Sequence, residues 1–283
     1  MNSLIDTGPL FFCAERTAKP GRVCIVGCPF DGSVSFRPGS RFGPDAIRMV
    51  SEGLESYSPA LDRDLEDLAF SDLGNIAAHG NAEAVSKAVF ANLAEFHAFG
   101  LKPLLLGGEH SLSAGAVRAA LTRFPSLCLI QLDAHADLRD GYLDEKFSHA
   151  SAMRRCLDVL PPRSLFQLGI RSGLREEFEE MRREKRLMSV SAESIHTILA
   201  QLGDRPIYLT IDLDVFDPAV MPGTGTPEAG GIFWPQFEAM LSAIPRGRIV
   251  AADVVELAPM LDSSGCSTLL AAKVVRELVL HMQ

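Results

Sequence analysis

The stretch LCLIQLDAHAD, residues 127–137, is the most informative segment for the fold of this chain. Its first half, Leu127–Leu132, is an almost continuous apolar run, which is typical of a β-strand buried on both faces. A segment with acids and a histidine, Asp133–Asp137, follows directly. Strands of this kind lie in parallel sheets covered by helices, and ligands bind beyond their carboxyl ends. The stretch therefore predicts a parallel α/β sheet with candidate chemistry at the strand ends.

Short apolar runs alternate with helical patterns along the rest of the chain. Further strands are predicted at Val23–Cys28, Pro103–Leu106, Leu165–Gly169, Ile207–Leu213 and Ile249–Val255. Helices are predicted at Asn81–Phe99, Ser111–Phe124, Ala150–Leu160, Trp234–Ile244 and Ser267–Met282. This alternation predicts right-handed crossovers with helices on both faces of the sheet. No linker or internal repeat interrupts the pattern, so we expect a single α/β domain over residues 1–283.

The composition excludes several classes of protein. The 283 residues include 27 Lys and Arg against 36 Asp and Glu, a net charge of −9, whereas a mainly electrostatic nucleic-acid binder needs a basic face. No uncharged apolar run approaches the ~18 residues of a spanning helix, and no basic stretch leads into an apolar core at the N-terminus. We therefore expect a cytoplasmic protein with a small-molecule substrate and neither a nucleic-acid nor a membrane partner.

Two further features are interpreted as structural. The six cysteines are scattered without zinc-type spacing, so we expect them to be small buried apolar residues rather than ligands or disulfides. The basic run Arg182–Arg186 is expected to be a solvated helix face rather than a polyanion site.

Acidic residues and histidines also follow three other predicted strands. The segment GGEH at residues 107–110, the segment DLD at residues 212–214 and Glu256 each stand at the end of an apolar run. In extended backbone, residues i and i+2 point to the same side, so the acids and histidine of DAHAD should face one way, as should both acids of DLD. The pattern gives six candidate metal ligands: His110, Asp133, His135, Asp137, Asp212 and Asp214.

Four carboxylates gathered at one rim would repel one another unless cations lie between them. Carboxylate and imidazole donors without thiolates favour Mn²⁺ or a similar ion over a structural zinc site. Six donors exceed what one ion needs, so we expect two Mn²⁺ ions that share bridging carboxylates. Each motif alone could also be a capped loop or a tight turn with surface acids, but the three together favour the metal site.

Seven segments of the sequence resemble the ureohydrolase (arginase/agmatinase) family. Four resemble its signature blocks: GGEHSLS (107–113), QLDAHADLRD (131–140), FSHAS (147–151) and TIDLDVFDPAVMPGTGTPEAGG (210–231). Three resemble the agmatinase branch in particular: SFRPGSRFGP (35–44), LGIRSGLREE (168–177) and ADVVELAP (252–259). The resemblance covers nearly the whole chain from about Val23. It implies a three-layer α/β/α fold, a dinuclear manganese centre, and hydrolysis of a guanidino compound to urea and an amine.

The resemblance also implies roles for single residues. One ion would be held by His110, Asp133, Asp137 and Asp212, and the other by Asp133, His135, Asp212 and Asp214. His149 matches the family's catalytic histidine and would carry a proton to the departing amine. Glu256 matches the glutamate that pairs with the guanidinium group. The alternatives are a surface histidine at a helix start and a structural acid. The implied assembly is a homotrimer or homohexamer.

The loop before His149 bears on the choice of guanidino compound. It lacks the Asn/Thr/Ser-rich pattern with which arginases hold the carboxylate of an amino acid in this region. Its three acids, Asp140, Asp144 and Glu145, suit a substrate that ends in an ammonium group. Arg139 argues the other way, since an arginine can bind a carboxylate bidentately. We therefore rank agmatine, which would give putrescine and urea, first, 4-guanidinobutanoate second and arginine third.

Two other classes of function are compatible with the same motifs. A catalytically idle relative would keep the fold for assembly or regulation, although the intact ligand spacing argues against it. An amide hydrolase or deacetylase of similar fold would release ammonia or acetate instead of urea. Bound metal and urea release together separate these possibilities.

Overall fold

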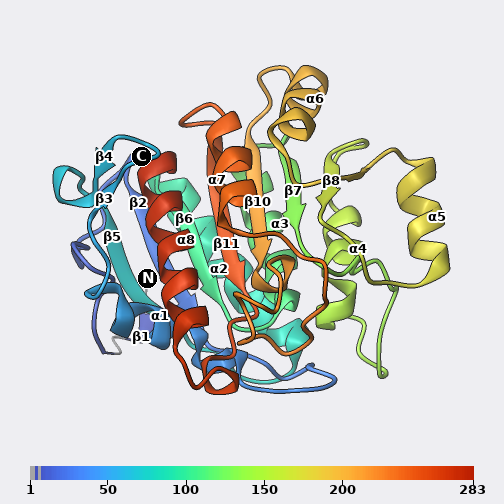
Figure 1. Ribbon diagram of the computed structural model, residues 1–283, viewed down its shortest axis with the longest axis horizontal. Helices are drawn as coiled ribbons and strands as arrows, with labels where there is room; N and C mark the ends of the chain where they lie inside the picture. Colours follow the sequence, from blue (N-terminus) through green and yellow to red (C-terminus); the bar gives the residue numbers. More distant parts are fainter. Residues whose placement is uncertain (1–3, 6–7) are drawn as a thin grey trace.

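The computed structural model describes residues 4–5 and 8–283, and the centre of this part of the chain is a nine-stranded sheet (Figure 1). Neighbouring strands are parallel except for β1 and β5. In sheet order the strands are β1 (Leu4–Ile5), β5 (Ser71–Ile76), β2 (Val23–Cys28), β6 (Lys102–Gly107), β11 (Ile249–Val255), β10 (Ile207–Asp212), β7 (Cys128–Leu132), β8 (Leu165–Leu168) and β9 (Leu187–Met188). The predicted mostly parallel sheet is confirmed.

Helices cover both faces of the sheet. Figure 1 shows α7 and α8 in front of the strands and α2 and α3 behind them. One face carries α1 (Gly43–Ser51), α6 (Ala192–Leu202), α7 (Trp234–Ala243) and α8 (Cys266–Met282). The other carries α2 (Ala82–Phe99), α3 (Ser113–Arg123) and α4 (Ala152–Leu157), with α5 (Arg175–Arg183) beyond them. The three-layer α/β/α fold is therefore confirmed.

The hydrophobic core consists of two layers, one on each side of the sheet. Side chains alternate along β2, so that Val23 and Ile25 pack into one layer while Cys24 and Val26 pack into the other. The central strands are buried throughout, which explains why their sequences are continuously apolar instead of alternating.

The predicted strands agree with the structure to within one residue at each end. Gly169 leaves β8 because its φ of 89° is not a strand conformation. The predicted end of the helix 150–160 was wrong, since α4 stops at Leu157 and turns follow up to Leu160. Pro161 accounts for Leu160 only, because the residue before a proline is driven away from helical conformation.

Several short elements were not predicted. These are β1, β5, β9, α1, α6, and a small two-stranded sheet of β3 (Tyr57–Ser58) and β4 (Arg63–Asp64). For α5, the sequence analysis expected only a helix face at Arg182–Arg186, whereas the helix ends at Arg183. The strand β5, SDLGNI, is polar, and α1 begins with Gly43-Pro44, so neither shows the apolar pattern on which the sequence analysis depended. Six 3₁₀ helices also occur among the described residues: η1 (Ser40–Phe42), η2 (Leu65–Asp67), η3 (His110–Leu112), η4 (His149–Ser151), η5 (Leu213–Val215) and η6 (Pro259–Leu261).

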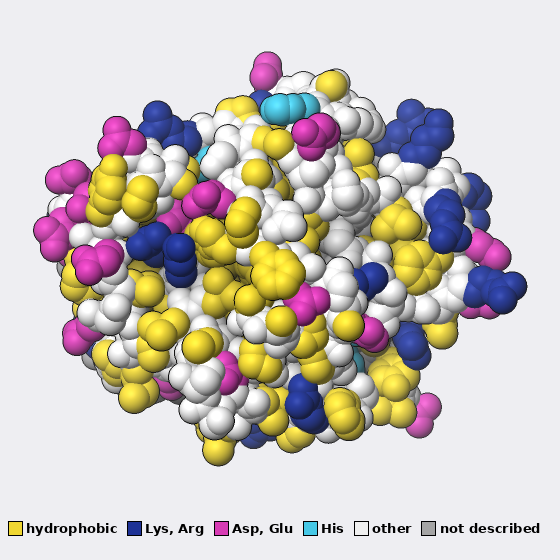
Figure 2. Space-filling model, in the orientation of Figure 1, with side chains coloured by type: hydrophobic (Ala, Val, Ile, Leu, Met, Phe, Trp, Pro, Cys, Tyr) yellow, Lys and Arg dark blue, Asp and Glu magenta, His cyan; other side chains and the backbone are white. Residues whose placement is uncertain are grey.

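The surface agrees with the interpretation of the basic run. Figure 2 shows Lys and Arg side chains gathered at the right of the molecule, over α5. Arg182, Arg183 and Lys185 are exposed, whereas Arg186 is buried and bonded to Glu180. No helix in the described part of the chain is both long and apolar enough to cross a membrane.

The cysteines are all free, as expected. Four are buried (Cys24, Cys28, Cys128 and Cys156), which confirms the prediction for them. The prediction was wrong for Cys266, which is exposed at the start of α8, and Cys13 is only half-buried.

Candidate metal centre and catalytic cleft

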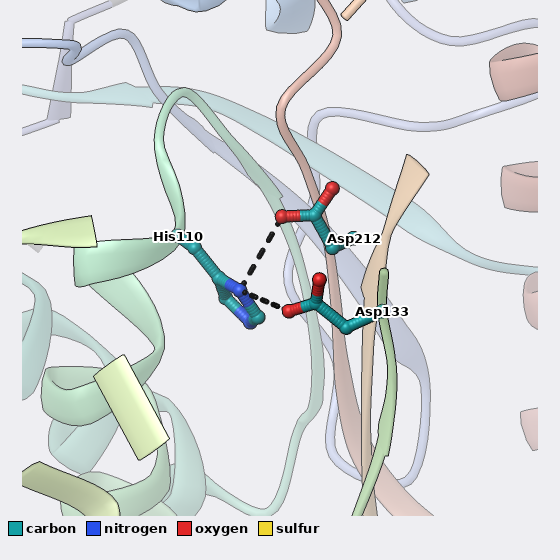
Figure 3. Close-up of side chains that lie close together, drawn as sticks. All are labelled: His110, Asp133 and Asp212. Carbon is teal, nitrogen blue, oxygen red and sulfur yellow. Dashed lines mark ion pairs between the residues drawn. The ribbon is translucent and has the colours of Figure 1, made fainter. Parts of the chain in front are cut away.

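Three strands of the central sheet bring a histidine and two aspartates together. His110 begins η3 directly after β6, Asp133 follows β7, and Asp212 ends β10. Figure 3 shows the His110 ring directed at both carboxylates. His110 Nδ1 lies 3.0 Å from Asp133 Oδ2 and 3.4 Å from Asp212 Oδ2. The same nitrogen lies 2.9 Å from Asp137 Oδ2.

A second group of ligand atoms shares Asp133 with the first. His135 Nδ1 lies 2.9 Å from Asp214 Oδ2 and 3.7 Å from Asp133 Oδ1. Within each group, His110–Asp133–Asp212 and Asp133–His135–Asp214, one ligand atom per residue lies within 4.8 Å of the others. The structure thus brings all six sequence-predicted ligands together, with Asp133 common to both groups.

Short local hydrogen bonds fix the direction of these carboxylates. His135 N donates to Asp133 Oδ1 over 2.6 Å, and Asp214 N donates to Asp212 Oδ1 over 2.9 Å. Ala134 N donates to Asp214 Oδ1 over 3.0 Å, which links the end of β7 to η5. Each bond uses a backbone amide two residues away or on the facing strand end. The segments DAHAD and DLD therefore hold their own acids in position.

The protonation of His110 shows why this arrangement needs a cation. Thr210 Oγ1 donates to Asp253 Oδ1, so toward His110 Nε2, at 2.9 Å, it can only accept a hydrogen bond. A neutral His110 therefore carries its proton on Nε2, and its Nδ1 lone pair faces three carboxylates. A metal ion or a proton must lie among them. Although burial opposes the charged form, the carboxylates of Asp133, Asp137 and Asp212 raise the pKa of His110 well above its ordinary value.

Burial makes this concentration of negative charge costly. Asp133, Asp212 and Asp214 are at most 3% exposed. Burial and the charge of Asp214 raise the pKa of Asp212 well above its ordinary value. Among the residues that the structure describes, no Lys or Arg forms an ion pair with these aspartates or with Asp137. The carboxylate and imidazole donors therefore fit divalent cations, which would supply the positive charge.

A cleft with a volume of about 260 Å³ opens onto this centre. His149, at the start of η4, and Glu256, just after β11, both line it. Glu256 Oε1 accepts a hydrogen bond from His110 N over 2.7 Å. Its φ of 67° is unusual for a residue with a side chain, and such strain concentrates at functional sites.

His149, which also lines the cleft, is held in place by two serines. Its backbone N–H donates to Ser33 Oγ over 2.9 Å, and its Nε2 lies 3.3 Å from Ser35 Oγ. Burial lowers the pKa of His149 to about 4, so its imidazole is neutral at pH 7. The Tyr142 ring packs edge-on against it, with centroids 6.0 Å apart.

Several residues of the site were not predicted from the sequence. They are Ser33, Ser35, Thr210, Asp253 and Glu177. Ser35 and Glu177 stand inside the segments SFRPGSRFGP and LGIRSGLREE, which could have drawn attention to them. Thr210 and Asp253 stand in apolar strands, and they too belong to quoted segments, TIDLDVFDPAVMPGTGTPEAGG and ADVVELAP, although nothing in those segments singled them out.

The expectation about the acidic loop was wrong in its geometry. Of the described residues Asp140, Asp144 and Glu145, none lines the cleft. Asp140 instead forms an ion pair of 2.7 Å with Arg155, and its side chain is 88% exposed. From that loop, Arg139 and Tyr142 line the cleft, and the Arg139 guanidinium lies 4.6 Å from the Tyr142 ring centroid. Besides Glu256 and the ligands Asp137 and Asp212, the acid that lines the described cleft is Glu177.

Comparison with known proteins gives relatives along almost the whole chain. It is 42% identical over 280 residues to an agmatinase of Bacillus anthracis, covering 97% of this chain and 96% of the relative. It is 39% identical over 279 residues to an agmatinase of Bacillus subtilis, with the same two coverages. The crystal structure of agmatine ureohydrolase of Thermoplasma volcanium is 31% identical, with a TM-score of 0.86 over 98% of this chain and 95% of that one.

The family model for arginases matches residues 21–281, which include every segment that carries the candidate site. The fold of the solved relative and the two layers around a parallel sheet agree with this match. The chain therefore belongs to the arginase family.

Proposed function

We propose that the protein is an agmatinase, a metal-dependent hydrolase that converts agmatine into putrescine and urea. The observation that carries the proposal is the cleft that places Glu256 and His149 beside two groups of carboxylate and imidazole donors. A cleft of about 260 Å³ has room for a small molecule. The identity to agmatinases of two bacilli supports agmatine as the substrate.

Two Mn²⁺ ions are part of this proposal. The first would be held by His110, Asp133, Asp137 and Asp212, and the second by Asp133, His135, Asp212 and Asp214. Harder oxygen donors together with imidazole match manganese, and no cysteine thiolate takes part. When bound, the two ions would supply a strong nucleophile at neutral pH by lowering the pKa of water toward ~7.

Glu256 would orient the guanidinium group. One of its oxygens already accepts from His110 N, so the other is left for the substrate. Burial and the charge of Glu109 raise the pKa of Glu256 well above its ordinary value. A guanidinium cation beside it would offset both effects and form a charge-assisted hydrogen bond. Glu256 therefore holds the guanidinium carbon next to the metal centre.

His149 would carry the proton that the departing amine needs. As a neutral imidazole it can accept a proton inside the cleft and then donate it to the leaving nitrogen. The burial that lowers its pKa to about 4 makes it neutral at pH 7 and a readier donor once it has been protonated. It lines the cleft without belonging to either group of ligand atoms, so it is free to act without binding an ion.

Glu177 would contact the ammonium tail of agmatine. It is 5% exposed and lines the cleft. Its Oε1 accepts from Leu138 N over 2.9 Å and its Oε2 accepts from Leu174 N over 2.6 Å, so its carboxylate is held firmly. This residue takes over the role that the sequence had suggested for the acidic loop.

A guanidino acid such as 4-guanidinobutanoate is the second candidate. Arg139 lines the same cleft, and a guanidinium there suits a carboxylate tail. The choice between the two substrates depends on whether Glu177 or Arg139 meets the tail.

Urea release from a panel of guanidino compounds tests the proposal. Protein loaded with Mn²⁺ should show its highest kcat/KM with agmatine, ahead of 4-guanidinobutanoate and arginine. A preference for 4-guanidinobutanoate would reject the agmatinase assignment and keep the ureohydrolase one. Acetate or ammonia without urea would indicate an amide hydrolase, and full metal content without any product would indicate an idle relative.

We also propose a homotrimer or homohexamer, acting in the cytoplasm as a single domain. The family resemblance supports the assembly, and light scattering at micromolar concentration measures it directly. A monomer would reject the assembly and leave the chemistry of the cleft intact.

A further inference from the structure

Glu109 is a buried acid between the metal centre and His149 that has no part in the roles described so far. It is 0% exposed. Its Oε2 accepts from Ser33 N over 2.7 Å. Its Oε1 accepts from Ser33 Oγ over 2.6 Å and from Ser111 Oγ over 2.5 Å. Three short donors therefore point at one carboxylate, and two of them belong to Ser33.

Ser33 connects this carboxylate to His149. Its oxygen accepts from His149 N over 2.9 Å and lies 3.4 Å from His149 Nδ1. A serine has one hydroxyl proton, and that proton is donated to Glu109. Toward the imidazole, Ser33 can therefore only accept. The nearby Nδ1 must carry a proton for this contact to be favourable, which leaves Nε2 unprotonated, with its lone pair able to accept from the Ser35 hydroxyl at 3.3 Å.

We propose that Glu109 and Ser33 are positioning residues that hold His149 as the Nδ1–H tautomer, with the Nε2 lone pair available as the proton acceptor in the cleft. Nε2 lies on the side of Ser35, which itself lines the cleft. The inference rests on the proposed function, because it takes His149 as the proton carrier.

The backbone around Glu109 is built to bring Ser33 to this point. Gly108 N donates to Cys28 O over 3.0 Å, and Glu109 N donates to Phe30 O over 2.8 Å. A Cβ on Gly108 would lie 1.8 Å from Phe30 O, so only glycine permits this approach. The segment GGEH thus has two roles: it supplies His110 to the metal centre and anchors the loop that reaches His149.

The proton balance of the reaction agrees with this arrangement. His149 Nε2 takes the proton that the attacking water gives up, and the ring becomes an imidazolium while Nδ1–H keeps its contact with Ser33. The same Nε2 proton then passes to the departing nitrogen, and the neutral Nδ1–H tautomer returns. The Glu109 carboxylate, one hydroxyl away, stabilises the transient positive charge in the same manner as the acid behind a catalytic histidine in other hydrolases.

The isosteric substitution Glu109→Gln should change the tautomer of His149. Ser33 N–H can only donate, so the amide oxygen must face it, and the amide nitrogen then occupies the position of Oε1. That nitrogen donates to Ser33 Oγ, which releases the hydroxyl proton for His149 Nδ1. We expect the tautomer to reverse, with the proton on Nε2. Ser33→Ala removes the acceptor, so both tautomers should appear.

Ser111→Ala is the matched control. It removes a hydrogen bond to the same oxygen of Glu109, but Ser111 makes no hydrogen bond with His149 among the described residues. The His149 tautomer should stay as in the parent. The comparison therefore separates a general disturbance of Glu109 from the loss of its connection to the histidine.

Solid-state ¹⁵N spectra of enzyme labelled at histidine report the tautomer directly. The protein is loaded with diamagnetic Zn²⁺ for the spectra, and the His149 signals are those that disappear in His149→Asn. With Mn²⁺, Glu109→Gln should lower kcat for agmatine by about 10–100-fold and leave KM within about threefold, as expected for a defect in proton transfer. Metal content should equal that of the parent.

The inference is overturned if the parent His149 carries its proton on Nε2, or if Ser33→Ala and Ser111→Ala leave the same His149 spectrum. Should Glu109→Gln fail to fold, this pair of serine variants decides. A parent that releases no urea yet shows the Nδ1–H tautomer would reject the proposed function while the arrangement of Glu109 and Ser33 stands.

Discussion

Two clusters that contain buried aspartates, one around Asp72 and one at the metal centre, balance their charge in different ways. Asp72 on β5 pairs with Arg48 on α1. Arg48 Nε and Nη2 each donate to one oxygen of the Asp72 carboxylate over 2.8 Å. At the metal centre, Asp133 is equally buried, but its side-chain partners are the amide of Gln131 and two histidines. The first cluster contains its own cation and the second does not.

This difference shows which region of the protein should depend on ions in solution. The Arg48–Asp72 pair is complete once the chain has folded, and Arg48 Nη1 also donates to Asn75 Oδ1 over 2.6 Å. The stability of this region should not depend on ions in solution. The four aspartates of the cleft need a cation from outside, so the stability and activity of that region should follow metal concentration.

The largest effect is expected where both groups of ligands meet. Asp133→Ala removes a residue common to both, and we expect kcat/KM to fall by about 10³-fold or more, which corresponds to roughly 4 kcal/mol. Elemental analysis should find little bound manganese. His110→Ala, which affects one group, should retain more. Equal metal content in Asp133→Ala and the parent would contradict the sharing of Asp133.

A substitution in the Arg48–Asp72 cluster should change the stability of the protein and not its metal binding. Arg48→Met leaves Asp72 buried without its cation, and breaking such a pair costs about 3–5 kcal/mol of unfolding free energy. Urea denaturation with and without Mn²⁺ measures this. The loss should be the same in both conditions, because the metal centre is intact. A loss that manganese abolishes would mean that the two clusters are coupled.

Metal removal provides the reciprocal test. An ion present at about 100 times its dissociation constant stabilises the native state by ~2.7 kcal/mol, which is roughly 5–10 °C in Tm for a chain of this length. Chelation of the parent should produce a downward shift of that size in a thermal melt. Asp133→Ala should show almost none, since it has little metal to lose. Identical shifts in the two proteins would argue against ions at this centre.

The smallest effect on metal binding is expected from residues that contact a ligand without holding the ion themselves. Thr210→Val removes the hydroxyl that accepts from His110 Nε2, and such supporting contacts are worth about 10–100-fold in metal affinity. Thr224→Val is a suitable control, because the buried Thr224 hydroxyl has no hydrogen-bond partner among the described residues. Titration with Mn²⁺ should show weaker binding only in the first variant.

The metal centre could be predicted from the sequence because its ligands follow a local rule. Asp133 and His135 stand two residues apart after an apolar strand, and the alternation of a strand turns both the same way. The clusters held by distant partners could not be predicted. Asp72 stands in a polar segment and is buried only because Arg48 covers it. Ser33 and Glu109 are separated by 76 residues, and Ser33 and His149 by 116.

The order of strands has a consequence for how the protein is made. The strand β11 lies between β6 and β10, and its residue Ala252 pairs with Leu104, so the two contacting segments are 148 residues apart in the chain. Contacts over such separations form slowly, because a long loop must be closed first. A chain still on the ribosome that has not yet reached residue 249 has His110, Asp133 and Asp212 but lacks the strand that lies between β6 and β10. Asp133, His135 and Asp214 follow the paired strands β7 and β10, whereas His110 can join Asp133 and Asp212 only in a nearly complete chain.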